Sequence, residues 1–238
     1  MKEGKPGEAM KIGIICAGDD EVTPILSMMR TEKISHKAML KFYEGKLENQ
    51  NIVTLFSGVC KVNAAIATQI LIDTYGCDAI INAGTAGGMD DSLDTFDLVV
   101  STQTAYHDVD EEILTDFHPW MKSCYFQADE KLVSLARNVA KKYMQDSQVV
   151  FGTTVTGENF IEENEKKKIL EKYAPLSVDM ETASIAHVCY VNEIPFLAVR
   201  VITDCANEEA KYNFEENCRK ASEKSAEFVR RMLKEWKE

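Results

Sequence analysis

The sequence contains no run of apolar residues long enough to cross a membrane. A transmembrane helix needs about 20 consecutive, predominantly apolar residues, and polar or charged side chains interrupt every apolar stretch of this chain sooner. The first ten residues, MKEGKPGEAM, are charged and contain glycine, which is not the composition of a signal peptide. We therefore expect no membrane partner, and we read residues 1–10 as a disordered extension.

An excess of positive charge is also missing. The 238 residues include 27 Lys and Arg against 39 Asp and Glu, which gives a net charge of −12 at pH 7. An acidic protein repels a polyphosphate, so nucleic acid is not an expected partner. The apolar fraction of 45% and the charged fraction of 28% are ordinary for a globular protein with a sizeable core.

Clustered cysteines are absent as well. Seven cysteines are scattered along the chain, and no C-x-x-C or Cys/His cluster occurs among them. Neither a zinc site nor a disulfide framework has the spacing it needs, so we expect no metal. An odd number of unclustered cysteines is typical of a protein from the reducing cytoplasm.

Several motifs of nucleotide enzymes and hydrolases are missing. The chain has no G-x-x-x-x-G-K-[ST] sequence and no G-x-S-x-G sequence, which disfavours a P-loop enzyme and an α/β-hydrolase. The stretch Gly13–Gly18 is not a clean G-x-G-x-x-G fingerprint, so a dinucleotide site is weakly supported.

The chain does contain short apolar strands that alternate with amphipathic helices. This alternation predicts a mostly parallel sheet covered on both faces. No repeat or linker divides the chain, so residues 11–238 are expected to form one domain. The clearest predicted strands are Lys11–Ala17, Asp78–Gly84 and Pro195–Thr203, and the clearest predicted helices are Lys61–Tyr75, Asp129–Tyr143, Thr182–Asn192 and Phe214–Trp236.

Carboxylates follow three of the predicted strands. Glu21, Glu181 and Asp204 each come shortly after an apolar run, and the glycine cluster Gly84–Gly88 follows another. Ligands of open α/β sheets bind beyond the carboxyl ends of the strands. A single carboxylate at such a junction is most often a helix cap. Three at one edge are better explained by chemistry or by a polyol ligand.

The ordered set of motifs resembles a known family. The chain is similar, from Lys11 to its C-terminal helix, to bacterial 5′-methylthioadenosine/S-adenosylhomocysteine nucleosidases of the nucleoside phosphorylase superfamily. The motifs that carry the resemblance are Lys11–Ile15 followed by Glu21-Val22, Ser57–Ala65, Ile81–Gly88, Tyr106–Asp110, Val178–Val188 and Pro195–Asp204.

The resemblance implies an α/β fold, a three-layer α/β/α sandwich with a central mixed sheet. It also implies a homodimer that hydrolyses the N-glycosidic bond of an adenine nucleoside. No cofactor is needed, because water is the second substrate.

The resemblance also supplies roles for individual residues. Asp204 would be the general acid that protonates purine N7, and Glu21 would be the base that activates water. Glu181 would accept hydrogen bonds from the ribose hydroxyls, Met180 would pack on the sugar and Phe160 would stack on adenine. Further residues implied around the nucleoside are Thr85, Gly87, Ile161 and Phe214. Supporting roles fall to Thr203, to Asp179, which would lie behind the site or cap a helix, and to Arg200. Arg200 would either orient Asp204 or form a plain buried ion pair.

Two other functions stay open at this point. A phosphorylase would need arginines that clamp phosphate, and none of the six arginines falls in Ser57–Gly88, the loops expected beside the ribose. A non-catalytic nucleoside-binding module would not need all three carboxylates. Gly18 and the segment 115–124 depart from the family pattern, so the preferred 5′ substituent is not predicted.

Overall fold

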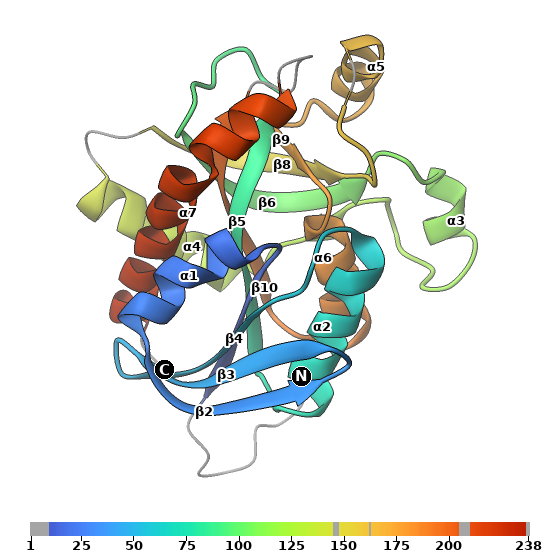
Figure 1. The fold of residues 1–238 in the computed structure, drawn as a ribbon. Coiled ribbons are helices and arrows are strands. Elements are labelled where there is room, and N and C mark those ends of the chain that lie inside the picture. Colours follow the sequence, from blue (N-terminus) through green and yellow to red (C-terminus); the bar gives the residue numbers. More distant parts are fainter. Residues whose placement is uncertain (1–9, 145–147, 162, 205–209, 237–238) are drawn as a thin grey trace.

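The computed structural model describes residues 10–144, 148–161, 163–204 and 210–236. Ten strands form one mixed sheet in the order β10-β6-β8-β9-β5-β1-β4-β3-β2, with β7 paired to β6 (Figure 1). The strands are β1 (Lys11–Cys16), β2 (Arg30–Lys37), β3 (Leu40–Leu47), β4 (Gln50–Phe56), β5 (Ala79–Gly88), β6 (Leu98–Tyr106), β7 (Phe126–Gln127), β8 (Val149–Thr156), β9 (Ser177–Asp179) and β10 (Phe196–Asp204). The helices are α1 (Asp19–Met28), α2 (Lys61–Asp73), α3 (Glu111–Thr115), α4 (Glu130–Tyr143), α5 (Glu163–Tyr173), α6 (Thr182–Val191) and α7 (Ala210–Glu235).

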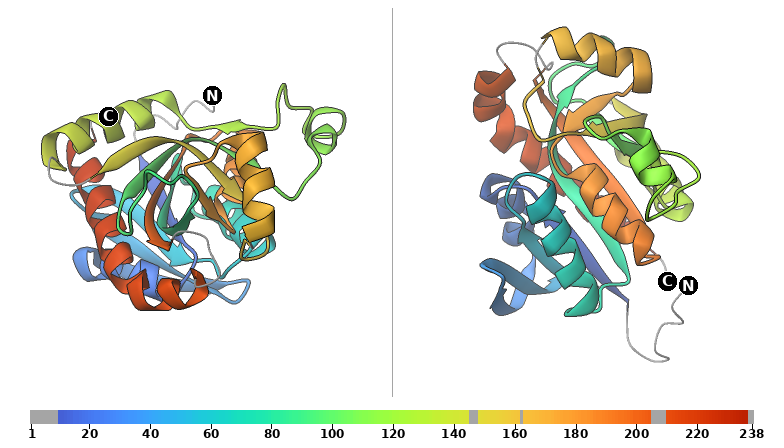
Figure 2. Two further views of the ribbon diagram at one scale, coloured as in Figure 1. Left: turned by 90° about the horizontal axis from the view of Figure 1, so that it is seen from above. Right: turned by 90° about the vertical axis from the view of Figure 1, so that its right-hand side faces the viewer.

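Helices cover both faces of the sheet, which confirms the three-layer α/β/α arrangement (Figure 2). One face packs against α1, α4 and α7, and the other packs against α2 and α6. Successive strand residues alternate between the two cores: Ile14 belongs to the first and Ile15 to the second. This period of two, in strands buried on both sides, explains why they read as continuous apolar runs.

The sheet is mixed rather than mostly parallel. β2, β3 and β4 follow one another as antiparallel hairpins without helices between them. β10 pairs parallel with β5 and antiparallel with β6. Because β10 touches both neighbours, the path β10-β6-β8-β9-β5 closes into a ring. The alternation of predicted strands and helices could not reveal this closure, because it depends on pairings distant in sequence.

The glycine cluster is part of a strand and not a loop. The predicted strand at Asp78–Gly84 is wrong at its end, because β5 continues to Gly88. β10 pairs with β5 as far as Gly87, and β9 pairs with Gly87 and Gly88. These two partners complete the backbone hydrogen bonds of a segment whose own residues favour turns.

Several ends of helices follow the expected chemistry. Asp129 caps α4, since its side chain accepts hydrogen bonds from the N–H groups of Lys131 and Leu132. Gly76, with φ of +66°, follows the last turn of α2. The short helix α3 and the charged helix α5 were not predicted. The expected extension 1–10 lies, apart from Met10, outside the described residues.

Within the described part of the chain, no helix combines the length and apolar character that crossing a membrane requires.

Candidate active site

Nearly all the residues expected around a nucleoside line one cavity of about 540 Å³. α1, β5, β9, β10 and the loop after β8 all contribute to its walls. The predicted site residues that line it are Glu21, Thr85, Gly87, Phe160, Ile161, Asp179, Met180, Glu181 and Asp204. Phe214 lies in α7, but its side chain is outside the described part of the structure.

A larger cavity, of about 1020 Å³, lies where β5 and β10 begin. Ala79, Phe196 and Trp236 are among its walls. It shares none of the carboxylates of the smaller cavity, so we assign the candidate site to the smaller one.

Glu21 bridges two strands beyond the point where their backbones pair. β1 and β5 pair only from Ile12 to Ile15 and from Ala79 to Asn82. Past this ladder, Glu21 Oε2 accepts hydrogen bonds from Ala17 N at 2.6 Å and Gly18 N at 3.3 Å. Its Oε1 accepts from Thr85 N at 2.7 Å and Thr85 Oγ1 at 2.8 Å. The carboxylate is therefore fixed by four donors at the wall of the cavity.

Asp204 ends β10 and is 5% exposed. Thr203 Oγ1 donates a hydrogen bond to Asp204 Oδ2 at 2.8 Å. The same hydroxyl also lies 3.3 Å from the carbonyl oxygen of Ala86, so it ties the aspartate to β5. Thr203 therefore contacts the carboxylate of Asp204 and the end of β5.

Glu181 reaches the cavity by a route that the sequence did not predict. β9 runs antiparallel to β5, so its carboxyl end points back along β5 rather than to the edge where β5 ends. Glu181 Oε1 accepts a hydrogen bond from Cys60 N at 2.9 Å. Its Oε2 lies 3.5 Å from Arg200 Nη2. The carboxylate is 4% exposed and is held from two sides.

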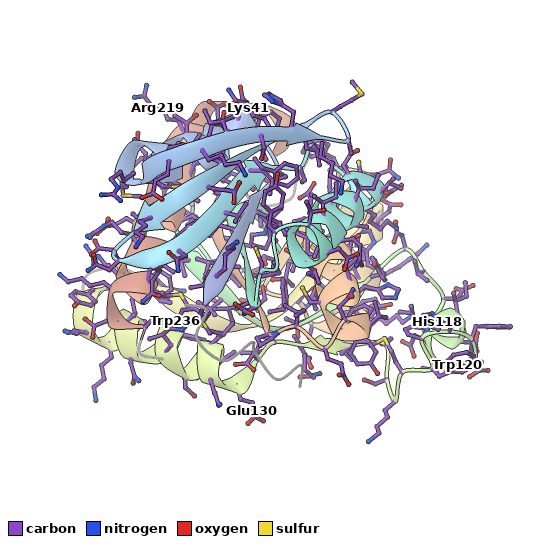
Figure 3. All side chains as sticks on the ribbon, turned by 90° about the horizontal axis from the view of Figure 1, so that it is seen from below. Lys41, His118, Trp120, Glu130, Arg219 and Trp236 are labelled. Carbon is purple, nitrogen blue, oxygen red and sulfur yellow. The ribbon has the colours of Figure 1, made fainter. Side chains whose placement is uncertain are left out.

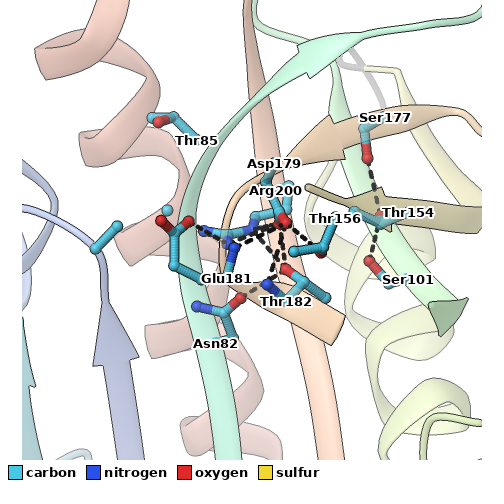
Figure 4. A network of polar contacts seen from close by, with 12 residues as sticks. Asn82, Thr85, Ser101, Thr154, Thr156, Ser177, Asp179, Glu181, Thr182 and Arg200 are labelled. Atoms are coloured by element: carbon cyan, nitrogen blue, oxygen red, sulfur yellow. Dashed lines mark hydrogen bonds and ion pairs between the residues drawn. The ribbon is translucent and has the colours of Figure 1, made fainter. Parts of the chain in front are cut away.

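Of the two expectations for Arg200, the described part of the structure shows the buried ion pair and no contact that would orient Asp204. The Arg200 side chain is fully buried and its Nε donates to Asp179 Oδ2 at 2.8 Å and to Thr182 Oγ1 at 3.1 Å (Figure 4). The guanidinium therefore belongs to the Asp179–Glu181 side of the site. Its Nη1 is buried and has no hydrogen-bond partner in the structure.

Asp179 lies under the start of α6, whose N-cap residue is Glu181. Its Oδ1 accepts from Thr156 Oγ1 at 2.7 Å, from Glu181 N at 3.2 Å and from Thr182 N at 3.1 Å. It also accepts from the Thr182 hydroxyl. The aspartate therefore accepts the N–H of Thr182, the first residue of α6, and balances the charge of Arg200.

Some contributors to the site could not be read from side-chain patterns. Cys60 supplies a backbone N–H to Glu181 from a conformation with φ of +80°, which favours glycine. Val59, Asn159 and Cys218 also line the cavity. A backbone donor such as the N–H of Cys60 cannot be recognised from the type of residue that carries it. Cys218, by contrast, lies one helical turn after Phe214 and could have been found from that spacing.

The cavity is strongly acidic. Asp19 and Asp20 join Glu21, Asp179, Glu181 and Asp204 in its walls, and no lysine, arginine or histidine occurs among the described residues that line it. Arg200 lies buried beside this surface and is the cation to which Asp179 and Glu181 are paired. Such a field favours neutral or cationic ligands and repels anions.

Burial, reinforced by the charge of Asp179, raises the pKa of Glu181 to about 7. The charge of Arg200 and the N–H of Cys60 act in the opposite direction. Glu181 can therefore gain or lose a proton near neutral pH. In its ionised form it could accept a hydrogen bond from a ribose hydroxyl.

Comparison with known proteins gives the family. The family model of the phosphorylase superfamily matches residues 11–234. A 5′-methylthioadenosine/S-adenosylhomocysteine nucleosidase from Staphylococcus carnosus is 37% identical over 231 residues, which cover 94% of this chain and 99% of that protein. The chain belongs to the phosphorylase superfamily, among its methylthioadenosine/S-adenosylhomocysteine nucleosidases.

Two solved structures show the same fold. The nucleosidase of Neisseria meningitidis, in complex with methylthio-immucillin-A, has a TM-score of 0.89 and 32% identity, covering 95% of this chain and 99% of that one. A futalosine hydrolase of Helicobacter pylori has a TM-score of 0.88 and 29% identity, covering 96% and 99%. The expected superfamily and fold are therefore confirmed.

The pKa of Glu181 predicts how the stability of the unliganded protein depends on pH. The folded-state pKa exceeds the ordinary glutamate value of about 4.3, so between pH 4.5 and 7 the folded state binds more protons than the unfolded state. The free energy of unfolding should therefore fall as pH rises through this window, by up to about 1.4 kcal/mol per pH unit. Chemical denaturation at several pH values measures the slope.

Glu181→Gln should flatten this slope, whereas the control Glu223→Gln, on the exposed side of α7, should leave it unchanged. Equal slopes in the wild type and Glu181→Gln would show that Glu181 titrates normally.

Proposed function

We propose that this protein hydrolyses the N-glycosidic bond of an adenine nucleoside, 5′-methylthioadenosine and/or S-adenosylhomocysteine. The products are adenine and a 5′-substituted ribose. One observation carries this proposal: Glu21, Glu181 and Asp204 arrive from three separate elements at one acidic cavity whose size suits a nucleoside. As a member of its family, the chain is an N-glycosyl hydrolase.

In the proposed reaction, Glu181 accepts hydrogen bonds from the ribose hydroxyls and Met180 packs on the sugar. Phe160, which is 52% exposed at the cavity wall, is free to stack on adenine. Ile161 presents its backbone to the base. These contacts would place the sugar between Glu21 and Asp204, with Thr85 and Gly87 along its edge.

The bond that breaks joins ribose C1′ to adenine N9. Asp204 gives a proton to N7, so the base leaves with the bonding electron pair as neutral adenine. The surrounding carboxylates stabilise the oxocarbenium-like charge that develops on the sugar. Water attacks C1′ and passes its proton to Glu21.

The charge of the cavity favours water over phosphate as nucleophile. A phosphorylase must bind an anion, usually with arginine, but six carboxylates and no cationic side chain line the described wall. Phosphate would meet electrostatic repulsion there. A non-catalytic binding module is disfavoured because ribose recognition needs Glu181 but neither Glu21 nor Asp204.

We expect adenine release from methylthioadenosine, S-adenosylhomocysteine and adenosine to proceed without phosphate. Adding phosphate should leave the rate unchanged. Chromatography of the released base, with inosine as a comparison substrate, measures this. A rate that requires phosphate would establish a phosphorylase, and binding of adenosine analogues without any release of base would establish a binding module.

We also propose a homodimer in the cytoplasm with a role in methionine salvage. α2 packs along α6 and exposes Val62 (67%) and Ile66 to solvent, and Tyr190 of α6 is half exposed. The loop that contains α3 projects away from the body and carries the exposed Phe117 and Trp120 (Figure 3). Pairing of two such faces would bury these side chains, and the partner's loop would close the 5′ end of the site.

Sedimentation velocity at micromolar concentration should show a dimer. Val62→Asp should shift it towards monomer and lower activity, because the substitution buries an unpaired charge at the interface. The control Met39→Asp, at the fully exposed tip between β2 and β3, should stay dimeric. A fully active wild-type monomer would contradict the proposed role of the partner.

A further inference from the structure

Gly84 occupies a position in β5 that does not need glycine for its conformation. Its φ lies outside the left-handed region, so an L-residue could adopt the same backbone. It is buried and pairs with Arg200 of β10. Its N–H donates to Ser225 Oγ of α7 at 3.0 Å. The backbone of Gly84 is therefore held by both β10 and α7, and neither contact depends on the absence of a side chain.

The space that a side chain would occupy at Gly84 is filled by two functional groups. A Cβ there would lie 2.5 Å from Glu21 Oε1, 2.6 Å from Glu21 Cδ and 2.7 Å from Arg200 Nη1. These distances are far shorter than the 3.5–4.0 Å of a normal contact. The carboxylate of Glu21 and Nη1 of Arg200 thus both lie next to the bare Cα of one strand residue.

Thr85, the next residue along β5, binds the carboxylate of Glu21 that lies against Gly84. Thr85 gives Glu21 Oε1 two hydrogen bonds, at 2.7 Å from its N–H and 2.8 Å from its hydroxyl. Both bonds require the carboxylate to lie directly against β5. A methyl group on Gly84 would push Oε1 away from the donors that fix it.

We propose that Gly84 is a positioning residue for the reaction: the absence of its side chain lets Glu21 lie against β5 within hydrogen-bonding distance of both Thr85 donors. This inference rests on the proposed role of Glu21 as the base that activates water. Glu21 and Arg200 are side-chain ends that can yield, whereas the backbone of β5 cannot. A methyl group at Gly84 should therefore displace the catalytic carboxylate before it disrupts the sheet.

The test is Gly84→Ala, with Gly13→Ala as a matched control. Gly13 lies in neighbouring β1, and a Cβ there would meet Ile80 Cδ1 at 2.6 Å and Leu71 Cδ1 at 3.0 Å. Both substitutions add a methyl group to a tightly packed, buried strand, but only the methyl group at Gly84 would contact Glu21. We expect Gly84→Ala to lower kcat for adenine release on the order of 100-fold, with a much smaller change in KM. Gly13→Ala should lower Tm and leave kcat nearly unchanged.

A second arm locates the cause of the loss. Glu21→Asp shortens the side chain by one methylene and makes room beside Gly84. Adding Gly84→Ala to Glu21→Asp should therefore lower kcat far less than adding it to the wild type, a non-additivity expected only for groups in contact. Equal losses of kcat in both backgrounds, or a wild-type kcat for Gly84→Ala, would overturn the proposal.

Thermal unfolding decides the case in which Gly84→Ala is unstable. The loss of Tm should be smaller in a Glu21→Ala background, where the carboxylate is gone. Failure to fold in both backgrounds would show that the obstruction lies elsewhere, and the proposal would be wrong. Failure of the proposed function is distinguishable, because the wild type would then release no adenine in the parallel assay.

Discussion

Arg200 is a fully buried cation, and the arrangement of the site depends on how its charge is balanced. A guanidinium inside a sheet is tolerated only with good partners, and removing one member of a buried ion pair costs roughly 3–5 kcal/mol. Asp179 supplies the closest carboxylate, Glu181 the next, and the charge of Glu21 also acts on Arg200. Three carboxylates from two segments of the chain, Asp179–Glu181 and α1, thus act on one charge.

Asp179 and Glu21 also have structural roles. Asp179 accepts the N–H groups of Glu181 and Thr182 and so fixes the backbone that carries Glu181. Glu21 joins β1 to β5 beyond the end of their ladder. The donors that hold Glu21 and Asp179 are mostly backbone N–H groups and threonine hydroxyls, so the surface facing the ligand keeps its negative charge. That surface suits a sugar that becomes cationic in the transition state, and it is unsuited to phosphate.

Much of the site was predictable from residues that follow apolar runs. Glu21, Glu181 and Asp204 were expected at one edge, and the structure brings them to one cavity. We expected them to meet because they follow the carboxyl ends of strands. This reason holds for Glu21 after β1 and for Asp204 in β10, whereas Glu181 follows β9, which is antiparallel to β5. The strand through Gly84–Gly88, the partners of Arg200 and the N–H of Cys60 all depend on contacts distant in sequence. Local patterns cannot contain that information.

In the proposed reaction, Glu21 and Asp204 move protons for a nucleoside held by Glu181. Single-turnover release of adenine from methylthioadenosine by Glu21→Gln and Asp204→Asn, beside the affinity of each variant for a non-hydrolysable analogue, tests it most directly. Both substitutions keep the shape of the side chain and remove its proton-transfer chemistry. We expect release to slow by roughly 10²–10⁴-fold in each variant while the analogue still binds. Wild-type release by either variant would contradict it.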